Sequence, residues 1–159
     1  NGFAAAPTMS DANAAAVTDW SSTSATDYSW NVDENNPVKV TANDPCPTGY
    51  RVPTRNEWVA VDTYNTAFRT GTFDAATSVF GNALHYGPVD TSIKLLTLPA
   101  AGLRLSTNGA LSSRGTNGSY WSSTEFGIGA YCFDFYSSSV YRSNDFNRAY
   151  GFSVRCIAE

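Results

Sequence analysis

The chain has few charged residues, no long apolar run and a single histidine. Charged residues make up 15% of its 159 residues, the formal net charge is −4, and Lys and Arg form no cluster. Because proteins that bind nucleic acids usually carry a clustered basic patch, we expect no nucleic-acid partner. No segment is apolar for long enough to cross a bilayer, so we also expect no direct insertion into a membrane.

Groups that bind metals or carry out catalysis are also scarce. The sequence has no Cys-x-x-Cys pair, and His85 has no second metal-type ligand at helical or hairpin spacing. The oxygen ligands that calcium needs are not gathered in any segment. Asp44, Asp134 and Asp145 lack an evident partner, and no Ser-His-Asp or paired-carboxylate spacing is visible. The sequence therefore predicts a protein that is not an enzyme and that uses no metal or cofactor.

Three cysteines are present, and their positions are informative. Cys46 and Cys156 flank the part of the chain that looks folded, which favours a disulfide that joins its start to its end. In the loop-entropy model, closing a loop of about 100 residues stabilises the fold by about 4 to 5 kcal/mol. Such a bridge would indicate an oxidising compartment and would leave Cys132 unpaired. The alternative is that both are buried free thiols in a cytosolic domain, since pairing cannot be read from sequence alone.

The first quarter of the chain differs in composition from the rest. Residues 1–41 are rich in Ala, Ser, Thr, Asp and Asn, and we interpret them as an extended or linker-like segment that packs on the domain formed by residues 42–159. Within this segment, residues 11–18 are a weak helix candidate because of their alanines.

The clearest helix is expected over residues 55–68. Thr54 can cap its first turn, and Glu57 stands where it completes a capping box. Apolar residues then recur at helical spacing and predict a buried stripe of Trp58, Val61, Tyr64 and Phe68. The helix is expected to stop near Gly71, and residues 73–88 are expected to form a loop.

After residue 88 the apolar residues repeat with a period of two. This pattern predicts short strands at residues 94–98, 101–105, 120–124, 130–136 and 152–157. In the fourth of these strands Tyr131, Phe133 and Phe135 are expected to face the core. The residues between them, Cys132, Asp134 and Tyr136, are expected to face outward. An early helix followed by short strands predicts an α+β fold with an antiparallel sheet.

Four segments carry a resemblance to a known family. They are Asp-Pro-Cys-Pro-Thr-Gly-Tyr-Arg-Val-Pro-Thr at 44–54, Leu-Pro-Ala-Ala-Gly-Leu-Arg at 98–104, Gly-Ser-Tyr-Trp-Ser-Ser-Thr at 118–124 and Arg-Ala-Tyr-Gly-Phe-Ser-Val-Arg-Cys at 148–156. In this order they closely resemble the Fibrobacter succinogenes major paralogous domain, a family widespread in gut Bacteroidetes. The resemblance covers most of the chain from about Trp30 onward. It implies a C-type lectin-type fold with short antiparallel strands and one or two helices.

Residues 51–54, followed by Glu57 and Trp58, also resemble the start of a helix in formylglycine-generating enzymes, which share that scaffold. Those enzymes need a paired, copper-binding cysteine site. The C-terminal half of this chain offers no such pair. The resemblance therefore supports the fold and not the chemistry, and an enzyme of that type would bind copper and show oxidase activity.

Some domains with this scaffold resemble variable proteins of diversity-generating retroelements. Such diversification excludes Lys, Gln, Glu, Met and Trp, and none of these occurs between Phe126 and Tyr150. The resemblance implies an outward-facing, variable ligand-binding surface. Its residues would be Ser119, Phe126, Gly127, Ile128, Cys132, Asp134, Tyr136, Tyr141, Ser143, Asp145, Phe146, Asn147 and Tyr150. An unpaired cysteine at an exposed position suits a randomised site.

We therefore expect a ligand-binding domain for receptor recognition, outside the cell, at a cell surface or on a phage particle. Its partner would be a protein or glycan on a cell surface, bound through aromatic anchors among adaptable polar groups. The alternative is a fixed adhesin or fimbrial-tip module of a gut bacterial surface protein. Arg104, Arg148 and Arg155 are expected to brace loops through backbone carbonyls.

Overall fold

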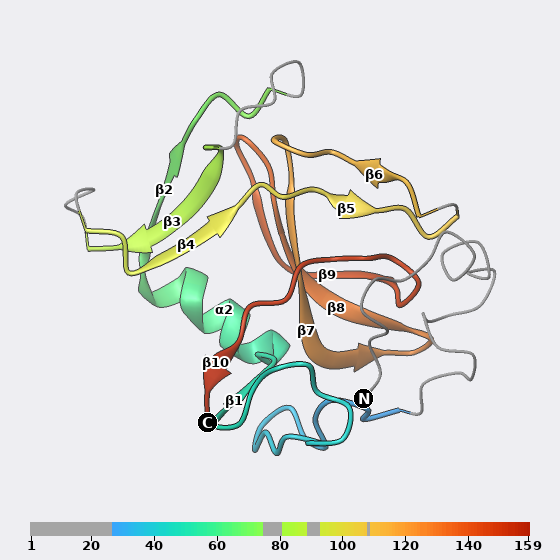
Figure 1. Cartoon of the computed structure of the whole chain (residues 1–159). Helices are drawn as coiled ribbons and strands as arrows, with labels where there is room; N and C mark the ends of the chain where they lie inside the picture. Colours follow the sequence, from blue (N-terminus) through green and yellow to red (C-terminus); the bar gives the residue numbers. More distant parts are fainter. Residues whose placement is uncertain (1–26, 75–80, 89–92, 108) are drawn as a thin grey trace.

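The computed structural model describes residues 27–74, 81–88, 93–107 and 109–159, so the helix candidate at 11–18 lies outside the described residues. These residues form one helix and short strands, whose arrangement can be followed in Figure 1. Their bounds are β1 (Tyr50–Arg51), α2 (Arg55–Tyr64), β2 (Thr66–Thr70), β3 (Ala83–Gly87), β4 (Leu96–Pro99), β5 (Leu103–Arg104), β6 (Leu111–Ser112), β7 (Gly118–Phe126), β8 (Gly129–Phe135), β9 (Val140–Asn147) and β10 (Ile157–Ala158). The strands of each sheet pair antiparallel, which confirms the α+β class with an antiparallel sheet.

The start of α2 agrees with the prediction and its end does not. The Thr54 hydroxyl accepts from the Glu57 amide, and the Glu57 carboxylate accepts from the Thr54 amide at 2.8 Å, which completes the capping box. The helix ends at Tyr64, whose side chain is 83% exposed, because Asn65 adopts an extended conformation. The residues predicted for its last turn form β2 instead, where Phe68 pairs with His85 of β3.

The strand β3 was predicted as part of a loop, and that prediction is wrong. It lies between β2 and β4 in a three-stranded sheet, and all five of its residues are buried. A strand that is covered on both faces has no alternation of polar and apolar residues, so the period-two signal is missing from Ala83–Gly87. The third strand of this sheet, β4, overlaps the strand predicted at residues 94–98.

A second three-stranded sheet has the order β7-β8-β9. The two residues Gly127 and Ile128 connect β7 to β8, and Gly127 has a φ of +54°, a conformation that suits glycine. The strand β9 lies at the sheet edge, and most of its residues are polar and at least partly exposed. It was not predicted as a strand, because without a buried face its sequence lacks a regular apolar period.

The core lies between α2 and the inner face of this second sheet. Trp58 of α2 is 2% exposed and stacks on Phe133 with ring centroids 4.9 Å apart. Phe133 and Phe135 are fully buried, as predicted, and pack with Leu84 of β3 and other apolar residues. Tyr131, predicted to be in the core, is only half-buried, because it lies near the hairpin tip, where its ring contacts Phe126 and Arg55.

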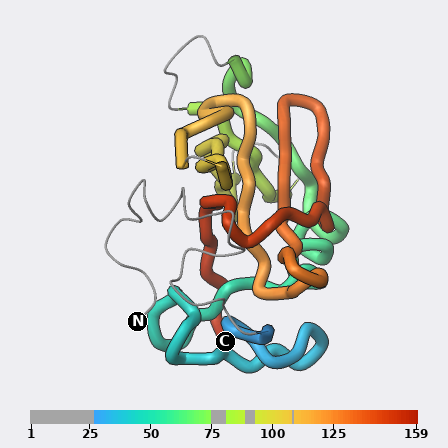
Figure 2. The backbone as a smooth tube through the Cα atoms, turned by 90° about the vertical axis from the view of Figure 1, so that its right-hand side faces the viewer, coloured from blue at the N-terminus to red at the C-terminus, as the bar shows by residue number. Residues whose placement is uncertain are grey.

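The end of the chain returns to its beginning. The strand β10 pairs with β1, and a disulfide joins Cys46 to Cys156 as predicted, with their Cα atoms 5.8 Å apart. Most of the predicted strand at residues 152–157 makes only an isolated bridge, between Ser153 and Tyr120 of β7. Figure 2 shows the described N-terminal residues and the C-terminal end side by side at one end of the molecule.

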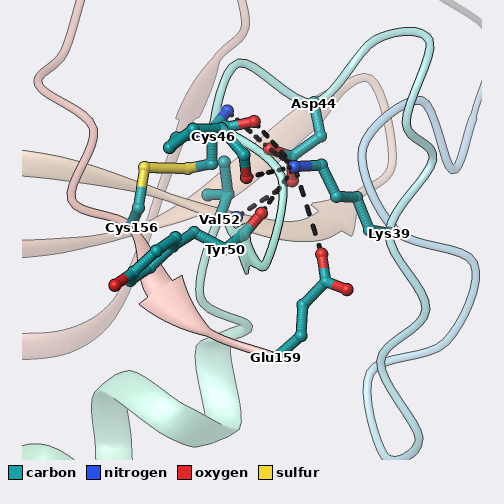
Figure 3. Close-up of a disulfide and its surroundings, with 8 residues drawn as sticks. Lys39, Asp44, Cys46, Tyr50, Val52, Cys156 and Glu159 are labelled. Carbon is teal, nitrogen blue, oxygen red and sulfur yellow. Dashed lines mark hydrogen bonds and ion pairs between the residues drawn. A yellow bond between two sulfur atoms is a disulfide. The ribbon is translucent and has the colours of Figure 1, made fainter.

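The described residues of the N-terminal segment pack on the rest of the domain. Lys39 donates to the backbone carbonyls of Cys46, Pro47 and Tyr50 at 2.6, 2.9 and 2.5 Å, next to the disulfide (Figure 3). Glu34 accepts a hydrogen bond at 2.9 Å from Arg55, the first residue of α2. These contacts hold residues 27–41 against the disulfide loop and the start of the helix.

Candidate functional site

The sheet β7-β8-β9 has two different faces. Phe133 and Phe135 lie on the face that packs on the core. Side chains alternate along a strand and cross-strand partners share a face, so the register defines the opposite side. We call this side the outer face, and it comprises Ser119, Trp121, Glu125, Ala130, Cys132, Asp134, Tyr141, Asn144 and Phe146.

The centre of the outer face is polar and buried. Ser119 Oγ donates to Asp134 Oδ1 at 2.8 Å, and Tyr136 Oη donates to Asp134 Oδ2 at 2.7 Å. Asp134 is 1% exposed and Cys132, two residues earlier on the same strand, is also 1% exposed. This carboxylate is therefore shielded from water and stabilised by two hydroxyl donors.

The prediction that Ser119, Cys132 and Asp134 face solvent is wrong. They alternate with core aromatics, but Ser119 of β7 and residues 132–135 of β8 are all buried, so both faces of the sheet are covered at this point. Alternation along a strand shows which residues share a face and does not show whether that face is exposed. The suggestion that Cys132 is an exposed random substitution fails for the same reason.

Aromatic rings surround this polar centre in two groups. On one side Tyr136 and Tyr141 pack edge to face, with centroids 5.8 Å apart. On the other side Phe146 packs against Phe152 at 5.2 Å. This second group is completed by Tyr150, which lies beside both phenylalanines, and by Trp121, on which Phe152 stacks at 4.3 Å. Tyr141 is 49% exposed, and Tyr136, Phe146 and Tyr150 are half-buried.

The tip of the β7-β8 hairpin is a separate exposed region. Phe126 and Ile128 are 52% and 76% exposed, and Gly127 between them is exposed as well. The Phe126 ring lies 5.0 Å from that of Tyr131, and the Arg55 guanidinium lies 4.8 Å from the same tyrosine ring. The structure therefore places the predicted residues 126–128 at this tip and not among the two aromatic groups.

Arginine side chains support the neighbouring loops, as predicted for two of three. Arg148 donates to the carbonyls of Gly127 and Gly129 at 3.2 and 3.0 Å, and so holds the hairpin tip. Arg104 donates to the carbonyl of Gly109 at 2.9 Å. Arg155 is exposed, and among the described residues no carbonyl contact of its side chain is found.

The remaining predicted residues lie on or beside the edge strand β9. Ser143, Asp145 and Asn147 are exposed, and Asn147 Oδ1 accepts from the amide of Ala149 at 2.8 Å. Several residues of the surface were not predicted as part of it: Trp121, Glu125, Ala130 and Asn144 of the outer face, and Phe152, which packs beside it. The only sequence signal that could have indicated Phe152 is its position two residues after another aromatic residue, Tyr150.

Burial and neighbouring charge alter two ionisable groups here. Burial, and then the hydrogen bond to Asp134, raise the pKa of Tyr136, so this phenol keeps its proton at neutral pH. Burial, and then the carboxylates of Asp134 and Asp145, raise the pKa of the Cys132 thiol, which is therefore neutral. Within the described ranges no group of three or more His, Cys, Asp or Glu side chains could hold a metal ion. The arrangement offers apolar contact and hydrogen bonding.

One part of the chain matches a known family model. Residues 88–157 match the model of a family described as a domain of unknown function (DUF8237). This region runs from before β4 into β10 and so includes the whole sheet β7-β8-β9. No curated protein and no solved structure showed a significant match to the chain. No helix in the described part is long and apolar enough to span a membrane.

Proposed function

We propose that this protein is a ligand-binding domain with a C-type lectin-type fold, and that its outer face, with the hairpin tip, recognises a protein or glycan at a cell surface. The observation that carries the proposal is the set of exposed and half-exposed aromatic rings around a hydrogen-bonded polar centre. Large rigid aromatic side chains among Ser, Asn and Asp are typical of recognition surfaces. An extracellular, cell-surface or phage-borne location is part of this proposal.

The arrangement of the four segments that resemble the Fibrobacter succinogenes major paralogous domain supports the proposed fold. Gly102 bridges to Gly118, and Arg104 bridges to Gly151, so the second segment contacts the third and the fourth. The disulfide joins the first segment to the fourth. Segments far apart in sequence thus meet in one framework, as expected if they specify a common fold.

The chemistry of the surface supports binding rather than a particular ligand. The side chains of Tyr141, Phe126 and Ile128 are about half exposed or more. A partner that covers these apolar groups would remove them from water, which favours binding. Ser143 supplies an exposed polar group along the edge of the same sheet, whereas Asp145 pairs with Tyr131 and so lies on the opposite side from Asp134. Contacts of both kinds are what a receptor-recognition surface uses.

Diversification by a retroelement remains part of the proposal for the exposed positions. The buried centre favours the alternative, a fixed adhesin or fimbrial-tip module, for at least Ser119, Asp134 and Tyr136. These three side chains form one hydrogen-bonded unit, and an independent substitution at any of them would leave a buried polar group without its partner. Random variation is therefore expected to be tolerated at Phe126, Ile128 and the exposed β9 residues and to be selected against in the centre.

A comparison of related loci from one community separates the two candidates. Substitutions concentrated at the exposed positions, with an adenine-rich template copy nearby, support diversification. Substitutions spread evenly over the surface and the framework support the fixed module.

Binding itself is tested by a screen of the folded protein against glycans and cell-surface proteins. For any ligand found, Tyr141→Ala and Phe126→Ala should each weaken binding by about tenfold or more if the ring is a central anchor, while leaving the fold intact. Tyr64→Ala is the matched control, because Tyr64 is 83% exposed at the end of α2, outside the proposed surface. Equal loss of binding in the control, or no ligand in the screen, would contradict the proposal.

A further inference from the structure

We propose that Asp134 is a positioning residue that fixes the phenol of Tyr136 as a hydrogen-bond acceptor toward the ligand, so that the ligand must present a hydrogen-bond donor at this point. The inference rests on the proposed function of the outer face and makes it more specific. It concerns the polarity of one contact, which exposure and composition do not reveal.

The geometry of Asp134 leaves little freedom to its neighbours. Its two carboxylate oxygens are hydrogen-bond acceptors, and the side chain is 1% exposed. Ser119 Oγ donates to one oxygen at 2.8 Å and Tyr136 Oη donates to the other at 2.7 Å. Because a buried carboxylate without donors is strongly destabilised, both hydroxyl protons are committed to it.

The consequence for Tyr136 follows from the chemistry of a hydroxyl group. A phenol has one proton to donate, and its oxygen can also accept. With the proton directed at Asp134, the half-buried Tyr136 can offer a partner only the accepting side of its oxygen. The edge-to-face contact with Tyr141, at 5.8 Å, further restricts the ring. A partner hydroxyl, amide or indole N–H fits this site, whereas a carbonyl or ether oxygen does not.

Replacing one carboxylate oxygen of Asp134 by an amide nitrogen should change the Tyr136 phenol from a hydrogen-bond acceptor toward the ligand into a donor. In Asp134→Asn the amide oxygen can still accept from Ser119, while the amide nitrogen donates to Tyr136 Oη. The phenol proton is then free to point toward the ligand. Asp145→Asn is the matched control, since it removes the same charge from an exposed residue of the neighbouring strand without contact to this unit.

The first test uses the free protein and needs no ligand. In protein labelled with ¹³C at the tyrosine Cζ, the Tyr136 signal is identified by its absence in Tyr136→Phe. We expect Asp134→Asn to move this signal markedly, because the phenol changes from donor to acceptor, and Asp145→Asn to leave it nearly unchanged. Equal shifts in the two variants, or none in either, would overturn the assignment of the phenol proton.

The second test measures donor preference with two probes of the same shape, indole and benzofuran, which differ in a single N–H donor. Titrations followed by NMR signals of Tyr136 and Tyr141 should show that the wild-type protein binds indole about fivefold more tightly. The ratio should fall to about one in Tyr136→Phe, a variant that keeps the ring. It should also fall in Asp134→Asn and persist in Asp145→Asn. Equal binding of both probes to the wild type, or no binding of either next to Tyr136, would overturn the inference.

These tests are independent of the ligand screen. If the screen finds no glycan or protein ligand but the Tyr136 signal and the probe ratio behave as expected, the proposed function fails and the polarity of the site stands. If a ligand is found whose affinity depends on Tyr141 but the probe ratio is one, only the polarity inference is wrong.

Discussion

The ammonium nitrogen of Lys39 lies 3.9 Å from Oδ1 of Asp44, in a site where the two side chains are 7% and 0% exposed. Asp44 accepts from the amides of Cys46 and Val52 at 2.8 and 2.9 Å. Figure 3 shows this pair beside the disulfide, with three carbonyls around the lysine nitrogen. A residue of the N-terminal segment thus organises the loop that carries Cys46.

Removal of the Lys39 charge should therefore destabilise the fold strongly. Lys39→Met keeps the aliphatic stem but leaves a buried carboxylate without its counter-ion, and we expect a loss of about 3 to 5 kcal/mol in the free energy of unfolding. Urea denaturation of the wild type and the variant measures this loss. Lys94→Met is the control, since Lys94 is exposed and is the only other lysine in the sequence. A Lys39 variant as stable as this control would contradict the role given to the pair.

We expect the disulfide to contribute a similar amount to the free energy of unfolding. Its two cysteines are 110 residues apart, and in the loop-entropy model a closure of this length stabilises the fold by about 4 to 5 kcal/mol. Unfolding midpoints with and without reductant should differ accordingly in the wild type. The difference should persist in Cys132→Ser and disappear in the double variant Cys46→Ser, Cys156→Ser. Alkylation of Cys46 and Cys156 in unreduced native protein would show that the bridge is absent.

The Cys132 thiol should be unreactive in the folded state. It is 1% exposed, and its pKa is raised by burial and by the nearby carboxylates of Asp134 and Asp145, so little thiolate forms at pH 8. A disulfide reagent that reports free thiols should label one thiol per chain, that of Cys132, at the rate at which the protein unfolds. Urea should accelerate this labelling. Rapid labelling of the native protein at pH 8 would contradict the buried position.

Acid should lower stability through His85. This imidazole is 3% exposed and lies 2.8 and 3.0 Å from the hydroxyl oxygens of Thr70 and Thr97. Burial, and then the charge of Lys94, lower its pKa below the ordinary 6.5. The unfolded chain therefore binds a proton at a higher pH than the folded chain does, so stability should decrease as pH falls below about 6.5.

His85→Gln tests the origin of this acid sensitivity. The amide can still bond to a threonine hydroxyl but does not titrate, and His85 is the only histidine in the chain. The free energy of unfolding of the variant should change less than that of the wild type between pH 6.5 and 5. If the free energy of unfolding falls by the same amount in the variant and the wild type, the acid sensitivity comes from carboxylates instead.

Local sequence chemistry was sufficient to predict several parts of the molecule. The hydroxyl of Thr54 and the carboxylate of Glu57 define the helix start because a capping box forms within four residues. The burial of Phe133 also agrees with expectation. These features depend on neighbours in the chain or on one strand's apolar face.

Features that depend on distant strands were mispredicted. Phe68 continues the apolar spacing of α2, yet it belongs to β2, because pairing with β3 outweighs one more helical turn. The strand β3 itself was mistaken for a loop, and its identity depends on the neighbours that cover both of its faces.

The amino-acid sequence by itself determined the α+β class and the helix start, because capping and periodicity are local properties of the chain. The positions of Cys46 and Cys156 favoured their pairing, which the structure then confirmed. Only the tertiary structure decided which polar residues are displayed. Ser119 and Asp134 alternate with aromatics as exposed residues would, but the sheet brings them together under surrounding rings, where each satisfies the other's hydrogen-bonding need. Burial of a polar group depends on partners that are remote in sequence, and so it is settled only when the strands assemble.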